Sequence, residues 1–509
     1  AALLMALPNA PSFYNPYENP EPTLQRRNNV LSSMYIEGYI TKKEYETALK
    51  HDFLVLEEPN SESKSRTIFY PEIVHYVLNE AAEKLNKDLD EVIEGGYRIE
   101  TAFDPYIYHQ VRKHISNPNY YPRNPSETEK IQGATVIIDP KTSELLAFTG
   151  AREDLTELSV FNRAFQMKRQ PGSAFKPLIA YGPALESGRF SQYSGVSCQN
   201  TFGNYRVRDG SCYGSKTMAE ALRVSNNGPA VWTLNSIGID YATKYVENLG
   251  IDLTTNDTNL SIALGGLYRG VSPLELANAY QVYANEGMMA NAYMITELRN
   301  TDGTVMLKRP EQVQKINVEN ANEMDQMLRR VVTSGTGRKA YIPGEKIAGK
   351  TGTSERATGR GNMDIWFVGF NDEVVSSVWM GYDQTDDRNF IPPRSTSSIT
   401  AHLFGRMVKD VITEKREEKV RDLDSFSINL RHSIKSNHLQ ISWKDRKNEW
   451  FEVYKNGRLI EVTDSGNWTD YNVISGENYE YQVHSYRKDT GEKQSESNIA
   501  QLNTNKSKP

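Results

Sequence analysis

The chain has 509 residues, a formal net charge of −6, 38% hydrophobic residues and 24% charged residues. Its length predicts about three or four domains, and its composition is that of ordinary globular material. The mild acidic excess argues against nucleic acid or an anionic membrane surface as the main partner. No apolar run approaches the roughly 20 residues of a membrane span, and no signal peptide opens the chain. Because the first residues begin in mid-pattern without a methionine, we expect a fragment of a longer protein.

The first 130 residues predict helices and linkers without a catalytic motif. Residues 34–38 and 42–49 indicate a helical hairpin, with Thr41 as N-cap and Glu44 at the capping-box position. Residues 61–65, rich in serine and charge, are typical of a linker. An amphipathic helix is then predicted over 73–85, and a turn and a strand over 95–104, after which Asp104-Pro105 opens another helix.

From residue 133 the pattern changes to strands, then helices, then strands. Two apolar runs, 134–140 and 144–150, surround a short polar turn and predict a hairpin that starts an antiparallel sheet. The helices are expected at 173–187, 216–225, 227–238, 240–249 and 272–286, and the later strands at 347–353, 364–370 and 374–381. This order predicts an α+β domain whose first and last strands pair around a helical insert.

The last 90 or so residues alternate as strands do. A charged hinge at residues 414–419 precedes them. Leu439, Ile441 and Trp443 share one face of a predicted strand, and Asn456-Gly457 marks a hairpin turn. Tyr479, Tyr481 and Val483 repeat the alternation in a later strand. We therefore predict an all-β C-terminal module.

The first catalytic candidates are Ser173 and Lys176, in Gln170-Pro171-Gly172-Ser173-Ala174-Phe175-Lys176-Pro177. At a spacing of i, i+3 on a helix, the lysine amine would lie close to the serine hydroxyl. A neutral amine there would take the hydroxyl proton and make Ser173 a nucleophile. The tetrapeptide alone is common, and a serine at a helix start is often only a cap.

Two other classes of enzyme fit the sequence less well. Residues 344–351 match the phosphate-loop pattern, but Pro343 precedes them and Gly352, Gly359 and Gly361 prevent a following helix, so a strand is favoured. A serine hydrolase with a histidine base is disfavoured because none of the eight histidines lies between residues 115 and 401. The same gap argues against a metal-dependent hydrolase. We expect no metal and no cofactor.

The two cysteines, Cys198 and Cys212, flank a segment rich in Gly, Asn, Arg and Tyr. A bridge between them would contribute about 3 kcal/mol in the chain-entropy model and would fit an extracytoplasmic protein. Two free thiols in a loop near the site are the interpretation we favour, and the pair is too small for a zinc site.

Two further motifs follow the first in a fixed order. Ser225-Asn226-Asn227 comes next and Lys350-Thr351-Gly352-Thr353 after it, and the three together are the set found in β-lactamases and penicillin-binding proteins. Supporting segments lie at residues 263–266, 271–277, 335–337 and 364–369. The chain resembles a class A penicillin-binding protein, a bifunctional peptidoglycan synthase, closely over about residues 130–415 and recognisably over 1–50.

The resemblance implies four parts of the chain. Residues 1–58 would be the C-terminal remnant of a family 51 glycosyltransferase domain, because 7–16 and 26–31 look like the end of one, and the catalytic glutamates of that family would lie upstream. A linker module would span 59–130. Residues 131–415 would form the transpeptidase domain, with the penicillin-binding and serine-β-lactamase-like fold of an antiparallel sheet flanked by helices plus a helical subdomain. Residues 424–509 would form a fibronectin type III-like domain.

It also implies roles for the motif residues. Ser173 would be the nucleophile and Lys176 its base, Ser225 would relay a proton, and Asn227 would hold the substrate amide and Lys176. Lys350 would supply positive charge, and with Thr351, Gly352 and Thr353 would receive a terminal carboxylate. The backbone amides of Ser173 and Thr353 would form the oxyanion hole. For this chemistry Lys176 must be neutral near pH 7, through burial or nearby positive charge.

The expected activity is that of a D,D-transpeptidase which cross-links peptidoglycan stem peptides ending in D-Ala-D-Ala and is acylated by β-lactams. Alternatives are a D,D-carboxypeptidase, a β-lactamase or a non-enzymatic β-lactam sensor. The resemblance implies a location on the outer face of the bacterial cytoplasmic membrane, with a single-pass anchor in the full-length protein. Cell-wall glycan or division and elongation proteins are possible partners of the C-terminal module.

Overall fold

The computed structural model describes residues 20–50, 70–153, 161–209, 212–357, 360–418, 424–426, 428–433, 438–444, 449–470, 473, 478–488 and 493–503. The chain divides into two compact units, residues 1–70 and 71–509. The segment 7–16 that resembles a glycosyltransferase and the predicted linker 61–65 lie outside the described residues.

The first unit contains a helical hairpin, as predicted. Helix α1 spans Pro20–Ile36 and α2 spans Lys42–Lys50. The Thr41 N–H donates to Glu44 Oε2 at 2.7 Å, and the Glu44 N–H donates to Thr41 Oγ1 at 3.3 Å, so the expected capping box is present. The rings of Tyr35 and Tyr45 stack 5.2 Å apart and hold the two helices together.

The second unit begins with the helices predicted over 73–85 and after Asp104 and with the predicted strand, together with a short helix and a 3₁₀ turn that were not predicted. These elements are α3 (Pro71–Leu85), α4 (Leu89–Glu94), β1 (Arg98–Thr101), α5 (Pro105–Ile115) and the 3₁₀ turn η2 (Pro118–Tyr120). Asp104 caps α5, since its carboxylate accepts the backbone N–H groups of Tyr106 and Ile107. Strand β1 joins a three-stranded sheet in the order β1-β9-β10.

A five-stranded antiparallel sheet forms the centre of this unit. Its strands are β2 (Gln132–Ile138), β3 (Leu145–Thr149), β12 (Ala348–Glu355), β13 (Asn362–Phe370) and β14 (Val375–Gly381), in the order β12-β13-β14-β2-β3. Strand β14 pairs with β2, with Val378 opposite Thr135, so the first and last strands meet as predicted. The α+β prediction is confirmed here.

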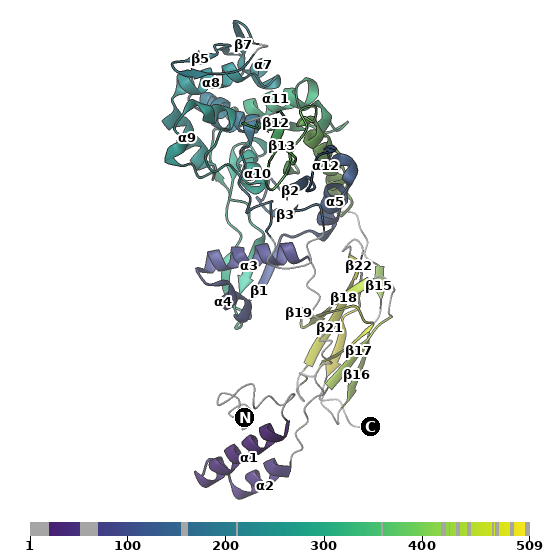
Figure 1. The fold of residues 1–509 in the computed structure, drawn as a ribbon. Helices are drawn as coiled ribbons and strands as arrows, with labels where there is room; N and C mark the ends of the chain where they lie inside the picture. The colour runs from purple at the N-terminus through teal and green to yellow at the C-terminus, as the bar shows by residue number, and fades with distance from the viewer. Residues whose placement is uncertain are drawn as a thin grey trace. The chain divides into compact units, whose positions relative to one another are not determined.

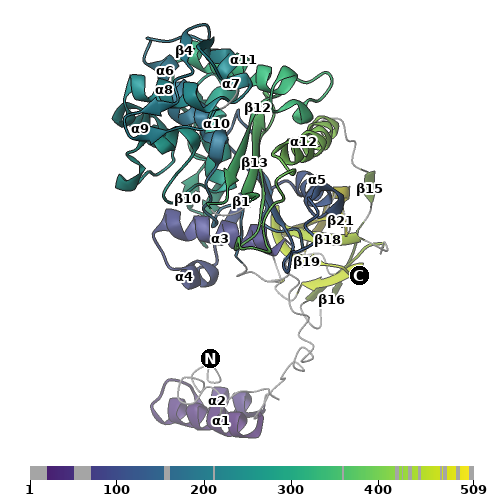
Figure 2. The ribbon, with the colours of Figure 1, turned by 45° about the horizontal axis from the view of Figure 1, so that its top comes forward.

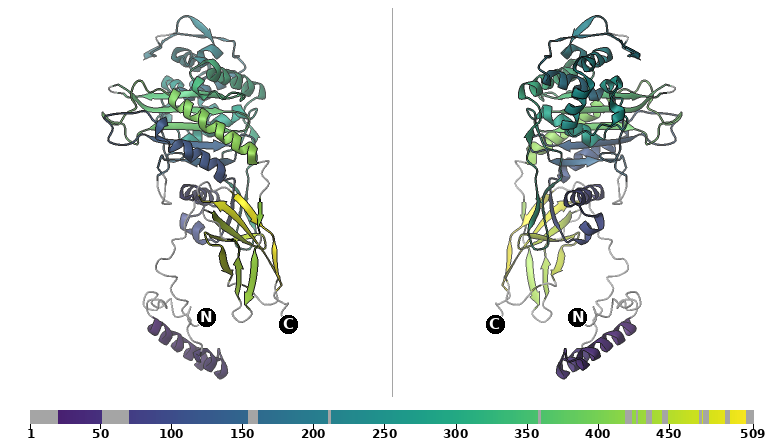
Figure 3. Two further views of the ribbon diagram at one scale, coloured as in Figure 1. Left: turned by 90° about the vertical axis from the view of Figure 1, so that its right-hand side faces the viewer. Right: turned by 90° about the vertical axis from the view of Figure 1, so that its left-hand side faces the viewer.

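Both faces of this sheet are covered by helices (Figure 2). On one face α5 and α12 (Ser398–Glu418) bury Val111 and Phe404 against Phe367 and Val378 of the sheet. Helix α12 lies across the sheet in Figure 3. On the other face lie α10 (Pro273–Ala284) and α11 (Val318–Ser334). Strands β2, β3 and β14 are buried along almost their whole length because both faces of the sheet are covered.

The helical insert lies between β3 and β12, where α7, α8 and α9 gather together (Figure 1). Its elements are η3 (Gly172–Phe175), η4 (Pro177–Tyr181), α6 (Gly182–Glu186), β4 (Gly195–Ser197), β5 (Thr201–Phe202), β6 (Tyr205–Arg206), β7 (Ser215–Thr217), α7 (Met218–Arg223), α8 (Asn227–Ile237), α9 (Ile239–Asn248), η5 (Thr255–Asp257), η6 (Leu260–Leu264), α10, β8 (Met288–Met289), β9 (Ile295–Arg299), β10 (Val305–Lys308), β11 (Val313–Gln314), α11 and η7 (Arg338–Ala340).

Two predicted helices differ from the structure. Residues 173–187 form a 3₁₀ turn, a π turn and a short α-helix rather than one helix, because Pro177 lacks an N–H and its carbonyl accepts from Gly182, five residues on. The predicted helix at 216–225 begins only at Met218. Its first residues belong to β7, and Thr217 caps α7.

The C-terminal part contains strands in the described residues. These are β15 (Asp424–Phe426), β16 (Asn429–Ser433), β17 (His438–Ser442), β18 (Glu449–Lys455), β19 (Arg458–Thr463), β20 (Asn467–Asp470), β21 (Asn478–Arg487), β22 (Lys493–Ser497) and β23 (Ala500–Asn503). They form a six-stranded and a three-stranded sheet. Leu439, Ile441 and Trp443 are buried as predicted, and β18 and β19 are joined at Asn456 and Gly457, both with positive φ.

Over the described ranges, we find no helix with the length and apolar character that crossing a bilayer requires.

Candidate functional site

The candidate nucleophile lies in a turn that packs directly on β12. Ser173 occupies the second position of η3, three residues before Lys176. Gly172 has φ +55°, and a Cβ there would lie 2.2 Å from the carbonyl oxygen of Thr353. A Cβ on Gly352 would lie 2.1 Å from the Pro171 carbonyl oxygen. Only glycine permits this approach of the two backbones, which brings Ser173 beside Thr353.

A buried polar cluster fixes the segment that precedes this turn. The Asp364 carboxylate accepts from Trp379 Nε1 at 2.9 Å and from Ser354 Oγ at 2.6 Å, and lies 3.8 Å from Arg169 Nε. Burial raises the pKa of Asp364, and the Arg169 charge opposes that rise. Trp366 Nε1 in turn donates to the Gln170 carbonyl at 3.0 Å. The segment before Ser173 is therefore tied to β13 and β14.

The Lys176 amine is fully buried and surrounded by acceptors. Its Nζ donates to the carbonyls of Ser225 and Asn226 at 2.7 and 3.0 Å and to Asn227 Oδ1 at 2.7 Å, and lies 3.4 Å from Ser225 Oγ. All three residues belong to the second motif. The first and second motifs, which are about 50 residues apart in the chain, therefore meet at one amine.

The third motif joins the same cluster through Lys350. Its Nζ, also fully buried, donates to Ser225 Oγ at 2.7 Å and to the Thr351 carbonyl at 3.0 Å. Ser225 lies in the turn between α7 and α8, as predicted, and its φ is +61°. Its hydroxyl is the shared neighbour of both lysine amines.

The remaining third-motif residues lie along β12. Thr351 is buried, and its Oγ1 lies 2.8 Å from Thr336 Oγ1, in one of the supporting segments seen in the sequence. Gly352 contacts the nucleophile turn, and Thr353 is partly exposed. Ser173, Ser225 and Asn227 are likewise partly exposed. The eight residues thus converge, with buried amines behind a layer of more accessible hydroxyl and amide groups.

Burial controls the charge of the two lysines. It lowers the pKa of Lys176 to about 7, while the Asp209 carboxylate opposes this change. Burial also lowers the pKa of Lys350 well below its usual value, and the charge of Lys176 lowers it further. The expected neutrality of Lys176 therefore rests mainly on burial and less on the neighbouring positive charge that the sequence suggested.

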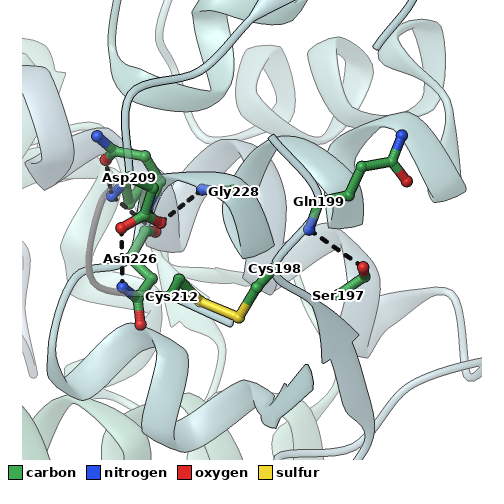
Figure 4. Close-up of a disulfide and its surroundings, with 9 residues drawn as sticks. Ser197, Cys198, Gln199, Asp209, Cys212, Asn226 and Gly228 are labelled. Atoms are coloured by element: carbon green, nitrogen blue, oxygen red, sulfur yellow. Dashed lines mark hydrogen bonds between the residues drawn. A yellow bond between two sulfur atoms is a disulfide. The ribbon is translucent and has the colours of Figure 1, made fainter. Parts of the chain in front are cut away.

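Asp209 is a residue of the site that the sequence did not reveal. Its carboxylate accepts the backbone N–H groups of Asn227 and Gly228 and the side-chain amide of Asn226 (Figure 4). It lies in a polar segment with no motif. Among the sequence features we considered, only Cys198 and Cys212, which flank this segment, pointed to a structural role for it.

The structure corrects the interpretation of those cysteines as free thiols. Cys198 and Cys212 form a disulfide, with their Cα atoms 5.3 Å apart (Figure 4). Strands β4 and β7 pair with each other, and the Cys198 N–H donates to the Gly214 carbonyl, so the two cysteines are brought together by the backbone.

Comparisons with known proteins agree with this geometry. The family profile of the penicillin-binding protein transpeptidase domain matches residues 133–409. Penicillin-binding protein 1F of Bacillus subtilis is 34% identical over 421 residues, which are 82% of this chain and 56% of that protein. Penicillin-binding protein 2a of Streptococcus pneumoniae is 33% identical over 427 residues, 81% of this chain and 57% of that protein. The chain thus spans little more than half the length of these relatives.

Solved structures share the fold. PonA1 of Mycobacterium tuberculosis, determined in complex with penicillin V, superimposes with a TM-score of 0.59 at 21% identity and covers 67% of this chain and 93% of its own. Penicillin-binding protein 1A of Haemophilus influenzae gives a TM-score of 0.56 at 18% identity, over 85% of this chain and 82% of its own. The predicted resemblance to class A penicillin-binding proteins is confirmed. Since the family profile spans more than half of its residues, the chain belongs to the penicillin-binding protein transpeptidase family.

Proposed function

We propose that this chain is a D,D-transpeptidase of peptidoglycan synthesis and that β-lactams acylate it at Ser173. The proposal depends mainly on two buried lysine amines that lie close to one hydroxyl. Lys350 Nζ lies 2.7 Å and Lys176 Nζ 3.4 Å from Ser225 Oγ. Lys176 follows Ser173 by three residues, so this cluster lies next to the candidate nucleophile. Such a cluster has little use as a structural element, because two buried amines cost desolvation free energy. It suits a serine enzyme whose base is a lysine.

In the proposed first step, Ser173 Oγ attacks the carbonyl carbon between the two terminal D-alanines and its proton passes to Lys176 Nζ. The N–H groups of Ser173 and Thr353 stabilise the negative charge that develops on the carbonyl oxygen, and each such donor is worth roughly 10²–10³ in rate. The carbon–nitrogen bond then breaks, Ser225 passes its proton to the departing D-alanine amine, and Lys176 returns the proton it took to Ser225. The product of this step is an ester on Ser173.

In the second step the amine of another stem peptide attacks the ester carbonyl. The attacking amine loses a proton to Lys176, the ester bond breaks, Lys176 passes that proton to Ser173 Oγ, and a new amide joins the two peptides. Asn227 is proposed to hold the substrate amide while Lys350, Thr351 and Thr353, with Gly352 between the two threonines, receive the terminal carboxylate of D-alanine or of a β-lactam. A base contributes about 10²–10⁴ in rate, which Lys176 supplies in its neutral form.

We propose domain assignments for the rest of the chain from its similarity to class A penicillin-binding proteins. We assign residues 1–58 to the end of a family 51 glycosyltransferase domain, 59–130 to a linker module, 131–415 to the transpeptidase domain and 424–509 to a fibronectin type III-like domain. The last would bind cell-wall glycan or division and elongation proteins. We place the protein on the outer face of the cytoplasmic membrane, with a single-pass anchor in the full-length protein. The Cys198–Cys212 disulfide supports the extracytoplasmic location, since disulfides persist in oxidising compartments.

The test is the intact mass of the protein after incubation with a labelled penicillin. We expect one stable adduct on the parent and none on Ser173→Ala. Ser116→Ala, at an exposed serine that follows α5, should retain the adduct and is the matched control. An adduct that persists on Ser173→Ala contradicts the assigned nucleophile, and rapid loss of the parent adduct with release of hydrolysed drug indicates a β-lactamase instead.

A further inference from the structure

Asn227 must hold one orientation to accept a hydrogen bond from Lys176, and residues from outside the three motifs impose it. Its Oδ1 accepts from Lys176 Nζ at 2.7 Å, while its Nδ2 donates to the Arg208 carbonyl at 3.1 Å. The Arg208 carbonyl can only accept. It therefore directs the amide nitrogen toward itself and leaves the amide oxygen pointing at Lys176.

The next residue, Asp209, holds the backbone of the same turn. Its Oδ2 accepts from the N–H groups of Asn227 and Gly228 at 2.6 and 2.8 Å, and its Oδ1 accepts from Asn226 Nδ2 at 3.0 Å. The two backbone groups open helix α8 and have no partner within the helix. A carboxylate there is favoured by the positive end of the helix dipole. Asp209 thus binds three consecutive residues at once, of which Asn226 and Asn227 belong to the second motif.

The disulfide fixes the position from which Asp209 does this. The Cys212 N–H donates to the Asp209 carbonyl at 3.4 Å, and Cys212 is bonded to Cys198. On the other side, a Cβ on Gly228 would lie 2.7 Å from the Gln199 carbonyl oxygen, so the chain after Cys198 runs against the start of α8. Figure 4 shows the disulfide beside Asp209, Asn226 and Gly228.

We propose that Asp209, held in place by the Cys198–Cys212 disulfide, is a positioning residue for the acylation step and acts through Asn227 on Lys176. This inference rests on the proposed function of Ser173 and Lys176. Asp209 reaches neither substrate nor nucleophile in the proposal. It holds the backbone of Asn227, whose side-chain amide the neighbouring Arg208 carbonyl orients, and it adds a negative charge near the buried amine.

The groups that face Lys176 are few among the described residues. Asp209 acts on it from the chain after β6, and Lys350 faces it from β12 across Ser225. Three tyrosines lie on the elements around it, Tyr181 on its own turn and Tyr280 and Tyr283 on α10, and burial raises the pKa of each, so they stay neutral. Asp209 is therefore the anion that opposes the effect of burial on Lys176.

The test is the pH profile of the acylation rate with a labelled penicillin, on the whole chain. Asp209→Asn should lower the plateau rate by about 10-fold or more, because an amide cannot accept all three hydrogen bonds. It should also move the midpoint of the acidic limb to lower pH, because a negative charge that favours the protonated amine is gone. Asp209→Glu, which keeps the charge, should keep the midpoint closer to that of the parent.

Asp240→Asn is the matched control, since Asp240 is an exposed acid in the first turn of α9, and it should leave the profile unchanged. Reduction of the disulfide, or Cys198→Ser with Cys212→Ser, should lower the plateau rate in the same direction as Asp209→Asn. An Asp209→Asn variant with the parent rate and midpoint overturns the proposal, as does one that loses only thermal stability. A reduced protein that acylates at the parent rate overturns the part assigned to the disulfide. Failure of the proposed function is distinct, because the parent would then form no adduct.

Discussion

The contact between Gly172 and Thr353 leads to a sharp prediction for Gly172→Ala. A Cβ at residue 172 would lie 2.2 Å from the Thr353 carbonyl oxygen, whereas ordinary contacts begin at 3.4 Å, so the two backbones must separate by about 1.2 Å (3.4 − 2.2). That displacement moves the Ser173 and Thr353 N–H groups apart. A misplacement of about 1 Å costs roughly 10² in rate, and loss of one oxyanion donor costs about 10²–10³.

The alanine also meets backbone strain, because φ is +55° at Gly172. Gly188→Ala separates the two effects. Its φ is +68°, and a Cβ there has no heavy atom within 4 Å, so it carries strain without the clash. We expect both variants to lose about 1 kcal/mol in stability from strain, while only Gly172→Ala loses acylation.

The assay is the second-order rate constant for acylation by a fluorescent penicillin, with thermal unfolding recorded on the same samples. Acylation of Gly172→Ala should fall at least about 100-fold below that of Gly188→Ala. Parent rates in both variants would refute the argument that close approach of η3 and β12 builds the site. Equal losses in both would assign the effect to strain alone.

Three further outcomes are expected. Acylation should fall as the pH drops through about 7, where Lys176 becomes protonated, and Lys176→Arg, which stays charged, should lose about 10²–10⁴ in rate at every pH. Ile137→Ala, in the buried β2, should cost about 2–5 kcal/mol by urea unfolding, whereas Ile93→Ala, 56% exposed, should change stability by no more than about 0.5 kcal/mol. Tyr280→Phe, which removes the 2.6 Å hydrogen bond to the Ala174 carbonyl, should cost about 1–3 kcal/mol and be visible in the same unfolding curves.

Sequence patterns predicted the strands of the central sheet, because burial and glycine or proline content act on neighbouring residues. The apolar runs at 136–138 in β2 and 365–370 in β13 are continuous because both faces of the sheet are covered, and these runs could be seen in the sequence. The strand at β12 was also predictable, since glycines and Pro343 leave no room for the helix of a phosphate loop. The order of three motifs then indicated one site.

Other features depend on contacts between distant segments and left no local trace. Asp209 is one acid in a polar stretch, and only the folded chain brings it to the start of α8. The disulfide follows from the pairing of β4 with β7, two strands of three residues each that are too short to predict. The break in the helix after Ser173 arises where Pro177 and Gly182 meet the packing of α10, whose Tyr283 donates to the Pro177 carbonyl.

The pairing of β14 with β2 has a consequence for how the protein is made. Residue 138 must find residue 375, a partner that leaves the ribosome 237 residues later (375 − 138). Until then the hairpin of β2 and β3 exposes an apolar edge and two apolar faces in the nascent chain, and contacts of such long range form slowly. Folding of this domain therefore waits for a late segment, and the hairpin made early needs protection from aggregation throughout that interval.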